Sequence, residues 1–533
     1  MTGVTAATTA TVTAGGSARD TMRSAFDHAL SANRERVAVE FGGRTYRYLD
    51  LDRWAAAVAA QLRSRGVGPG DTVALYTHNC VEFIVADIAI ARLGAVKSPV
   101  NYMLPSDSVR YILEASGAKV VITDASLVLE AVALSSSLPL SPTVLQITGG
   151  GAPAAGALAL EDLPPGRVDP LGYLPLTADA PAALYFTGGT TGKPKGVLHT
   201  QRSTVALHTA QMLEGEISQD ERMLLMTPMA HAAGLFAQSA ILRGATCVIT
   251  DGFDAETAVD LFIERAITWT FLVPTMIYRV IDALRTRPVR ELGVRTIVYG
   301  AAPISPSRLE EALELFGPVF VQLYGQTEMP NWGTRLTKAD HDLSRPELLT
   351  SCGRASIMAD LQVVDEHSNP LPEGGTGEIC LRSAYVLQEY LNDPAATADK
   401  FLGNWIRTGD IGMIEDGYLY LKDRKNDMVI SGGMNVYSRE VEDVLARHPS
   451  VAAVAVIGIP HEDWGEAVHA VVVPRDETID AAGLLAWCRD LLAAYARPKS
   501  IEFVSSLPET AFGKVDKKIL REPYWSDRRR GIS

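Results

Sequence analysis

The sequence is poor in cysteine and in positive charge, and it contains no long hydrophobic run. Its 533 residues include five cysteines that stand far apart without a CxxC pair, which favours neither a disulfide framework nor a zinc site. Lys and Arg number 49 against 63 Asp and Glu, and the net charge of −14 argues against nucleic acid or an anionic membrane as the main partner. No stretch of about 18 apolar residues occurs, so we expect no membrane span. We therefore expect a cytoplasmic protein whose basic residues, where they cluster, serve a local anion.

The length of the chain predicts more than one domain, because single cores stop growing at roughly 250–300 residues. Residues 1–20 are rich in Thr, Ala and Gly, lack the apolar core of a signal peptide, and are expected to be disordered. We expect a large unit of several subdomains at 21–423 and a small domain at 424–533. The charged run at about 423–427 is a candidate hinge between them.

Short apolar runs alternate with helical patterns through most of the chain, which predicts an α/β fold with largely parallel sheets covered by helices on both sides. The pattern of predicted strands and helices changes near residue 423, where an α+β pattern indicates the smaller domain. The expected strands are 72–76, 119–124, 269–273, 295–300, 319–324, 451–460 and 468–474, and the expected helices are 81–94, 307–316, 438–450 and about 481–493.

The stretch at 185–196, Tyr-Phe-Thr-Gly-Gly-Thr-Thr-Gly-Lys-Pro-Lys-Gly, has the composition of a phosphate-binding loop. Its backbone N–H groups can form a nest for an anion, to which hydroxyls add donors and lysine adds charge. A Walker A loop is excluded, because Thr187 and Pro194 stand where that motif requires Gly and Ser or Thr. Taken alone, an ordinary flexible glycine loop is the alternative.

Four further segments carry candidate chemistry. Tyr-Gly-Gln-Thr-Glu at 324–328 and Gly-Ala-Ala-Pro at 300–303 each follow a predicted strand, and open α/β sheets keep their ligands at the carboxyl ends of strands. Arg-Thr-Gly-Asp at 407–410 is expected to place a carboxylate on a tight turn, and 508–514 places a lysine after a glycine on a loop. Each segment alone is equally consistent with a turn, a cap or a solvated lysine.

Together these segments, in this order, resemble the adenylate-forming superfamily of acyl-CoA synthetases, luciferases and peptide-synthetase adenylation domains. The resemblance covers about residue 25 to 525. It implies that an acid is activated with ATP to an acyl-adenylate, releasing pyrophosphate, and is then passed to a thiol.

The resemblance also implies roles for individual residues. The phosphate loop would hold the β- and γ-phosphates, although Gly188 replaces the Ser that is usual in the family. The small residues near 300 and Tyr324 would frame adenine, Thr327 would contact the α-phosphate, Glu328 would bind Mg²⁺, and Asp410 with Arg424 would hold the ribose. Lys514 matches the catalytic lysine, whose ammonium relieves charge at the α-phosphorus in the transition state. The implied nucleotide contacts are Thr187, Gly188, Gly189, Thr190, Thr191, Gly192, Lys195, Gly300, Ala301, Ala302, Pro303, Gln322, Tyr324, Gly325, Gln326, Asp410 and Arg424.

The small domain is expected to rotate between the two half-reactions. The hinge position implied by the resemblance holds Asn426 in place of the usual Lys or Asp. Ser431, Gly432 and Gly433 resemble the segment past which the pantetheine arm of coenzyme A runs in CoA ligases; a simple glycine turn is the alternative.

The segment 228–234, Pro-Met-Ala-His-Ala-Ala-Gly, aligns with the lining of the family's acyl pocket. It contains no acid to pair with a substrate ammonium, which disfavours an α-amino acid. Together with Met329, Pro330 and Trp332 it indicates a fatty, aryl or other apolar acid. His231 either shapes the pocket beside the carboxylate, as a catalytic residue, or is a buried structural histidine. Trp332 either lines the pocket or belongs to the core, and Arg335 is a candidate partner for a second carboxylate.

Three functions remain open at this point. The first is an AMP-forming acyl-CoA ligase that uses ATP, Mg²⁺ and coenzyme A. The second is a ligase that loads a separate acyl carrier protein. The third is a nucleotide-binding protein without catalysis, which the presence of both Glu328 and Lys514 disfavours. A homodimer is compatible with each.

Overall fold

The computed structural model describes residues 20–525, apart from 167–171, 173, 188–193, 265, 286, 288–291, 426, 477–478, 490 and 509–514. Most of the expected N-terminal tail and several predicted site residues lie outside this description. These residues are Gly188, Gly189, Thr190, Thr191, Gly192, Asn426 and Lys514.

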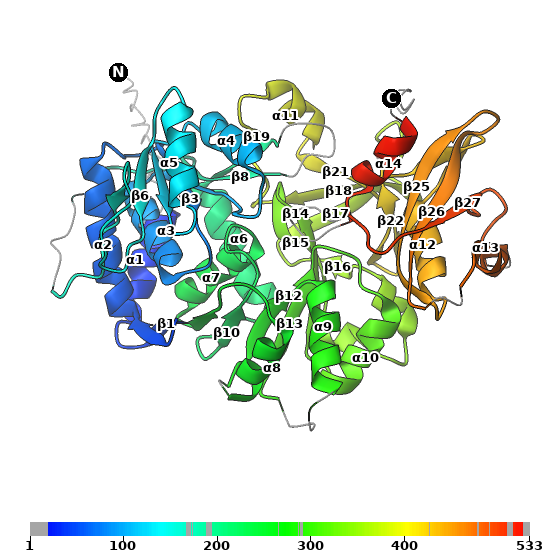
Figure 1. Ribbon diagram of the computed structural model, residues 1–533, viewed down its shortest axis with the longest axis horizontal. Helices are drawn as coiled ribbons and strands as arrows, with labels where there is room; N and C mark the ends of the chain where they lie inside the picture. The colour runs from blue at the N-terminus through cyan, green and yellow to red at the C-terminus, as the bar shows by residue number, and fades with distance from the viewer. Residues whose placement is uncertain are drawn as a thin grey trace, which may run out of the picture.

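The first large sheet has the strand order β16-β15-β14-β13-β12-β10-β11-β1-β2 in the described part of the chain (Figure 1). Strands β14 to β1 in this order are parallel, whereas β15, β16 and β2 are antiparallel. The parallel strands are buried on both faces, as their nearly continuous apolar runs predict. Their bounds are β1 (Val37–Phe41), β2 (Arg44–Arg47), β10 (Arg222–Leu225), β11 (Thr246–Ile249), β12 (Trp269–Leu272), β13 (Thr296–Gly300), β14 (Phe320–Gln326), β15 (Met329–Leu336) and β16 (Arg354–Ala355).

The second large sheet has the order β19-β9-β8-β4-β3-β5-β6-β7 among the described residues. It is parallel from β8 to β7, and the antiparallel strands β9 and β19 complete one edge. The bounds are β3 (Thr72–Tyr76), β4 (Val96–Pro99), β5 (Val120–Thr123), β6 (Thr143–Gln146), β7 (Leu158–Ala159), β8 (Pro181–Phe186), β9 (Gly196–Thr200) and β19 (Glu389–Tyr390).

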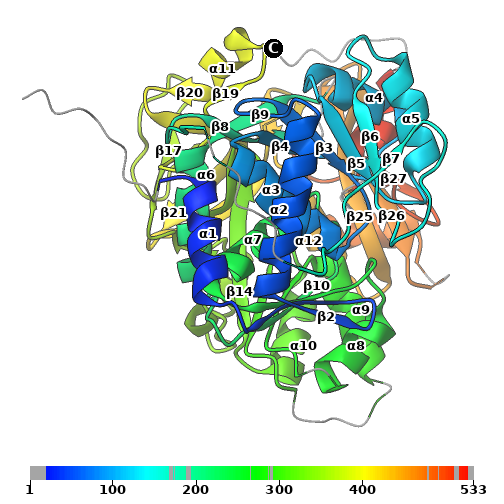
Figure 2. The same ribbon diagram turned by 90° about the vertical axis from the view of Figure 1, so that its left-hand side faces the viewer.

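Helices fill the space between the two large sheets and also cover their outer faces (Figure 2). Between the sheets lie α1 (Met22–Ala32), α2 (Tyr48–Ser64), α3 (Val81–Leu93), α6 (Gln201–Glu214) and α7 (Ala232–Arg243). The outer face of the second sheet is covered by α4 (Ser106–Ala115) and α5 (Val128–Ser137), and that of the first by α8 (Ala255–Glu264), α9 (Pro274–Arg285) and α10 (Pro306–Phe316).

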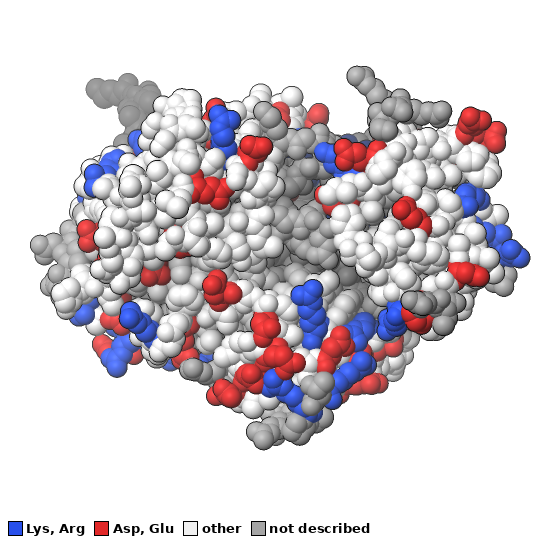
Figure 3. Space-filling model, viewed as in Figure 1, with Lys and Arg blue, Asp and Glu red and all other residues white. Residues whose placement is uncertain are grey.

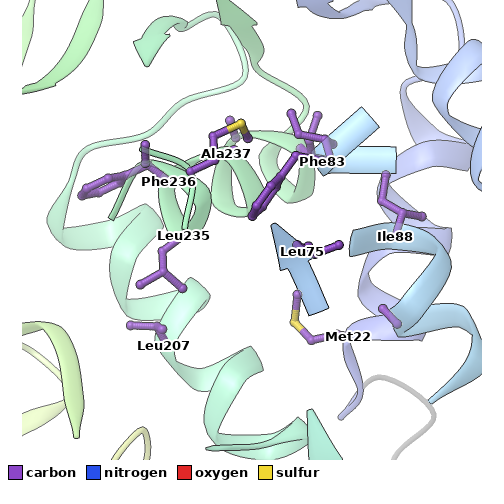
Figure 4. Packing of buried hydrophobic residues seen from close by; sticks show 14 of the residues in the cluster. Met22, Leu75, Phe83, Ile88, Leu207, Leu235, Phe236 and Ala237 are labelled. Carbon is purple, nitrogen blue, oxygen red and sulfur yellow. The ribbon is translucent and has the colours of Figure 1, made fainter. Parts of the chain in front are cut away.

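The central core joins these layers through side chains from both sheets and from the helices between them. Figure 4 shows Leu75 of β3 and Phe83 of α3 close to residues 235–237 of α7. Helix α3 is mostly apolar and all of its residues except Glu82 are buried, which is the pattern of a helix surrounded by protein. This packing fixes the strand ends on which the candidate site is built.

A third, smaller sheet packs on β15 and β16, and a fourth belongs to a separate C-terminal domain with its own apolar core. The third contains β17 (Ala359–Val364), β18 (Thr376–Ser383), β20 (Phe401–Leu402), β21 (Trp405–Glu415) and β22 (Tyr418–Arg424), with α11 (Pro394–Lys400) beside it. The fourth contains β23 (Val429–Ser431), β24 (Met434–Val436), β25 (Val451–His461), β26 (Gly465–Pro474) and β27 (Ser500–Phe503), with α12 (Ser438–Ala446), α13 (Ala481–Arg489) and α14 (Lys517–Trp525). The α/β fold class predicted from the sequence is confirmed.

Three local predictions differ from the structure. Helix α12 ends at Ala446 rather than at residue 450, because Pro449 disfavours helical backbone at the preceding residue. Residues 324–326 lie inside β14 rather than after it. Asp410 lies within the long strand β21, paired with Arg424 of β22, and not on a tight turn. In both cases pairing with the next strand of a hairpin, β15 for β14 and β22 for β21, extends the strand through glycine and polar residues that resemble a turn.

Candidate active site

The carboxyl ends of β13 and β14 form the floor of the candidate site. The two strands are parallel neighbours, with Gly300 beside Leu323. A Cβ at Gly300 would lie 2.5 Å from the Leu323 carbonyl oxygen, so only glycine allows this approach. Ala301 then turns the chain with φ of 66°. The predicted adenine frame, residues 300–303 and Tyr324, is therefore brought together on adjacent strands.

Tyr324 connects this frame to the predicted ribose-binding pair. Its hydroxyl donates a 2.6 Å hydrogen bond to Asp410 Oδ2, and Arg424 Nε lies 3.7 Å from Asp410 Oδ1. Burial, reinforced by the charge of Asp410, raises the pKa of Tyr324 well above its ordinary value, so the phenol stays a donor. Gln322, which precedes this group on β14, is buried and accepts a hydrogen bond from Tyr299, so its predicted nucleotide contact stays a prediction.

Glu328 lies just after β14, and its carboxylate is held by two side chains that the sequence analysis missed. Its Oε1 accepts a 2.5 Å hydrogen bond from Tyr390 and lies 3.6 Å from the Lys400 ammonium. Lys400 also donates to Gln326 Oε1 at 2.6 Å. No motif in the sequence marks Tyr390 or Lys400, because they come from β19 and α11 and reach Glu328 only in the folded chain.

The backbone of Thr327 is fixed by a third residue absent from the predictions. His199 Nε2 lies 2.9 Å from the Thr327 carbonyl oxygen, and burial lowers the pKa of His199 to about 4. The imidazole is therefore neutral at pH 7 and carries its hydrogen on Nε2, since a carbonyl only accepts.

The described ends of the predicted phosphate loop lie at the turn between β8 and β9. The Thr187 amide donates to the Lys195 carbonyl at 3.0 Å. Lys195 is exposed, and its ammonium lies 5.0 Å from the centre of the Tyr390 ring. Since Tyr390 also binds Glu328, Lys195, at the described end of the loop, lies near the predicted magnesium ligand. The loop residues 188–192 themselves lie outside the described part of the chain.

Glu328 fits a magnesium ion that arrives with a nucleotide. Mg²⁺ is commonly held by one or two carboxylates together with substrate phosphates rather than by a full cage of protein ligands. Within the described ranges no group of three or more His, Cys, Asp or Glu side chains is arranged to hold a metal ion, so a resident cage is not present there. A single, largely buried carboxylate near the predicted phosphate loop is what we expect of a site whose Mg²⁺ is also held by the phosphates of the nucleotide.

The predicted acyl segment forms the turn into α7. His231 is the residue that precedes this helix, and a Cβ at Gly234 would collide with the Met229 carbonyl oxygen. Trp332 is fully buried and donates to Gln211, so it belongs to the core rather than to an exposed pocket wall. Arg335 is paired with Glu214 at 3.3 Å and with Glu216, which leaves no support for a second substrate carboxylate there.

Ser431, Gly432 and Gly433 form the β23–β24 hairpin of the C-terminal domain. The Gly432 amide donates to the carbonyl of Trp464 at 2.9 Å. The indole of Trp464 is 39% exposed, stacks on His461 with ring centres 4.2 Å apart, and lies 4.9 Å from the Lys499 ammonium. An exposed aromatic surface with a cation beside it thus adjoins the hairpin, which the sequence alone did not indicate.

Charged side chains connect the two parts of the chain at the predicted hinge. Asp423, on β22, accepts from the backbone amide of Ser438 and from its hydroxyl, at the start of α12. Lys517 of α14 contacts Glu442 at 2.7 Å and donates to the Ser438 hydroxyl at 2.6 Å. Arg521, also on α14, pairs with Asp427. The helix that follows the predicted catalytic lysine is therefore fixed to residues on the C-terminal side of residue 426. Asp423 joins β22 to the C-terminal domain through Ser438.

Two family models match the chain. The model described as AMP-binding enzyme covers residues 26–391, and the model described as AMP-binding enzyme C-terminal domain covers residues 440–514. This chain belongs to the AMP-binding enzyme family. The resemblance drawn from the sequence motifs is confirmed, and with it the assignment to the adenylate-forming ligases.

Several curated relatives are similar to this chain. A medium/long-chain-fatty-acid–CoA ligase, FadD8 of Mycobacterium tuberculosis, is 40% identical over 372 residues, which are 68% of this chain and 65% of the relative, so less than two thirds of FadD8 is covered. A feruloyl-CoA synthase of an Amycolatopsis species is 34% identical over 92% of this chain and 96% of the relative. The fatty acid–[acyl-carrier-protein] ligase ScoC of Streptomyces coeruleorubidus is 34% identical over 93% of this chain and 95% of the relative.

A solved structure gives the same architecture. The amide bond synthetase McbA from Marinactinospora thermotolerans superposes with a TM-score of 0.86 at 31% identity, covering 94% of this chain and 99% of McbA. Within the described part of the present chain, no helix has the length and apolar character needed to cross a membrane.

Proposed function

We propose that this protein activates a carboxylic acid with ATP and transfers the acyl group to coenzyme A. In the first step a carboxylate oxygen of the acid attacks the α-phosphorus of ATP, and the bond to pyrophosphate breaks. In the second step a thiolate attacks the acyl carbonyl, and AMP leaves. One observation carries this proposal. The hydrogen-bonded pair of Tyr324 and Asp410 is suited to adenosine, and Tyr324 lies on the strand that leads to Glu328, the carboxylate near the phosphate loop.

Each side chain of this frame has a distinct part in the first step. Tyr324 offers a ring face to adenine while its hydroxyl orients Asp410, and Asp410 with Arg424 presents an acceptor and donors to the ribose hydroxyls. Lys195 adds positive charge where pyrophosphate departs. Glu328 holds Mg²⁺, which when bound neutralises charge on the phosphates. Lys514, outside the described residues, is proposed to supply a mobile ammonium at the α-phosphorus.

The acid is proposed to be apolar or aromatic. The turn before α7 carries no acidic side chain that could pair with a substrate ammonium. We keep His231 as a candidate for positioning the carboxylate. The relatives described as fatty-acid and feruloyl ligases support this range of acids without choosing within it.

Coenzyme A is favoured as the thiol by the surface around Trp464. The Lys499 ammonium, which lies over the exposed Trp464 ring, is suited to bind a phosphate of coenzyme A. The Gly432–Gly433 hairpin lies next to this surface and leaves room for a narrow pantetheine arm. Loading of a separate carrier protein is the second candidate, supported by the similarity to ScoC.

The chain is proposed to divide into an adenylation unit at 21–423 and a mobile unit at 424–533. The paired charges on both sides of residue 426 lie where such a movement would occur. We also propose a cytoplasmic location, since the substrates are cytoplasmic and the five cysteines are buried free thiols.

The test of this function is acid-dependent formation of AMP and pyrophosphate. Aliphatic, aryl and polycyclic carboxylates would be offered with ATP and Mg²⁺, first alone, then with coenzyme A, then with a panel of carrier proteins. We expect AMP release to require both an apolar acid and coenzyme A. Turnover with carrier protein but not with coenzyme A would select the second candidate, and no pyrophosphate exchange with any acid would reject both.

A further inference from the structure

An ammonium group occupies the place beside Glu328 where a metal ion is expected. Lys400, the last residue of α11, has its Nζ 3.6 Å from Glu328 Oε1 and 2.6 Å from Gln326 Oε1. The side chains of Lys400 and Glu328 are each only 11% exposed. A lysine this far buried is uncommon unless it is paired, so its position is set by these two partners.

The segment that delivers Lys400 is rigidly built. Tyr390 donates its hydroxyl to Glu328 Oε1, and its backbone amide donates to the Thr397 hydroxyl at 2.9 Å. Asp393 caps α11 by accepting from the Ala396 amide at 3.0 Å. Strand β19 and helix α11 thus form one unit that places both a phenol and an ammonium on the same carboxylate oxygen.

The contacts of Lys400 and Tyr390 with Glu328 stabilise the carboxylate in the protein without nucleotide. A nearly buried carboxylate is costly unless a positive charge or hydrogen bonds compensate it. Lys400 supplies the charge and Tyr390 the hydrogen bond. Glu328 is thereby neutralised and held in place before any metal ion arrives.

The same arrangement is incompatible with a metal ion on Glu328 while Lys400 stays where it is. A divalent cation bound to this carboxylate would lie close to the ammonium, in a largely buried site where like charges repel strongly. The lysine has a flexible four-carbon stem, so its charge can move while α11 stays fixed. The strongest nearby attraction would then be the phosphates of the nucleotide, which share the metal with Glu328.

We propose that Lys400 is a nucleotide-binding residue that exchanges partners. In the free protein it stands in for the metal at Glu328; when ATP and Mg²⁺ bind, it transfers its charge to a phosphate oxygen. This inference rests on the proposed function, because it requires that ATP binds beside Glu328. A purely structural tie between α11 and β14 is the competing explanation.

The test is equilibrium binding in K400M, measured by calorimetry. In EDTA, where no metal neutralises the phosphates, we expect ATP affinity to fall at least tenfold; with saturating Mg²⁺ the loss should be several-fold smaller. In the absence of nucleotide, Mn²⁺ followed by electron paramagnetic resonance should bind K400M more tightly than wild type, because Glu328 is no longer neutralised, and E328Q should abolish this gain.

Three further variants keep the test decisive. K338M is the matched control, because Lys338 is a partly buried lysine paired with Glu216 at 2.7 Å away from this site, and it should leave all three affinities unchanged. K400R retains the charge and should keep metal-free ATP binding close to wild type. If K400M does not fold, K400Q, which preserves a donor to Glu328, is expected to behave as described for K400M.

The outcomes separate the two levels of inference. Equal ATP affinity in wild type and the uncharged variants, or an equal loss with and without Mg²⁺, overturns the exchange and leaves a structural tie. Failure of wild type to bind ATP even with Mg²⁺ would instead reject the proposed function itself.

Discussion

Tyr324 and Asp410 are joined by a 2.6 Å hydrogen bond although they lie on different sheets and 86 residues apart in sequence. The bond makes the proposed adenine and ribose contacts one unit, since neither residue can shift without the other. The first large sheet and the smaller sheet carrying β21 therefore both contribute to the proposed nucleotide site.

Tyr324→Phe tests this coupling. A hydrogen bond to a charged group contributes about 1.5–3 kcal/mol, so we expect KM for ATP to rise roughly 10- to 100-fold with a smaller change in kcat. Initial rates of pyrophosphate exchange against ATP concentration measure it. Tyr385→Phe is the control, because it removes a similarly buried 2.6 Å bond, to the Trp332 carbonyl, and should lower stability without changing KM. Equal KM in both variants would contradict the role of Tyr324.

Glu328→Gln should impair the adenylation step selectively. Removing a charge that stabilises the transition state typically costs about 10²–10³ in rate, and the loss should be partly recovered at high Mg²⁺ concentration. Single-turnover formation of acyl-adenylate measures it. A variant that adenylates at the wild-type rate and with wild-type Mg²⁺ dependence would remove Glu328 from the metal site.

Lys514→Ala should abolish acyl-adenylate formation while thioester formation from supplied acyl-adenylate survives. The reason is that the ammonium is needed only where two anions meet at the α-phosphorus. Lys518→Ala is the comparison, since Lys518 is an exposed lysine four residues further along the chain and should retain both half-reactions. Loss of both half-reactions in K514A would point to a folding defect instead.

Lys517→Met should loosen the C-terminal domain. Lys517 is largely buried against Glu442, with 15% of its side chain exposed. Removing one partner of a fully buried pair costs roughly 3–5 kcal/mol because the other charge stays buried, so the loss here should be at most of this order. Thermal unfolding should show an earlier transition for this domain, whereas Lys518→Met should leave it unchanged. An unaltered melting profile would mean that Glu442 finds another partner.

Acid should destabilise the large unit through its buried histidines. Burial lowers the pKa of His199 and of His341 to about 4, and that of His208 to about 3, from an ordinary value near 6.5. At a pH between these pKa values, the histidines of the unfolded chain bind protons and those of the folded chain do not. The contribution of the buried histidines to the free energy of unfolding is therefore complete above pH 6.5 and is lost as the pH falls toward 4. Each shift corresponds to at most on the order of 3–5 kcal/mol.

His341→Gln isolates one of these contributions. His341 Nε2 lies 3.0 Å from the Tyr299 hydroxyl and Nδ1 lies 2.7 Å from the Thr337 carbonyl, and burial, which lowers the pKa of His341 to about 4, keeps the imidazole neutral at pH 7. The variant should be less stable at pH 7.5 but should lose less stability between pH 7 and pH 5 in urea titrations. An identical slope with pH would show that His341 is protonated without cost.

Most of the fold could be predicted from the sequence because apolar runs and helical patterns report local burial directly. Strand β3 and helix α3 follow from such patterns almost residue by residue. The extension of β14 to Gln326 and the placement of Asp410 inside β21 depend on hairpin pairing with the next strand, and the glycine and polar residues at these positions do not indicate it.

The same distinction applies to the site. Tyr324 and Glu328 belong to a motif that could be recognised in the sequence. The residues that contact this motif in the folded chain, Tyr390, Lys400 and His199, lie in segments without a recognisable motif. The charged residues that can be seen on one face of the molecule are interspersed rather than gathered by sign (Figure 3), so a surface view does not mark the site either. The side chains that hold a motif residue in place are therefore the part of the site that is hardest to predict from the sequence.

Helix α14 is the last described element to leave the ribosome, since synthesis proceeds toward the C-terminus. Until residues 517–521 have been made, Glu442 and Asp427 lack the partners that fix α14 within the C-terminal unit. The large unit has its own core and can fold earlier, as N-terminal domains generally do during synthesis. A nascent chain would thus fold the proposed nucleotide site before the C-terminal unit is complete. It could turn over substrate only after α14 has been made.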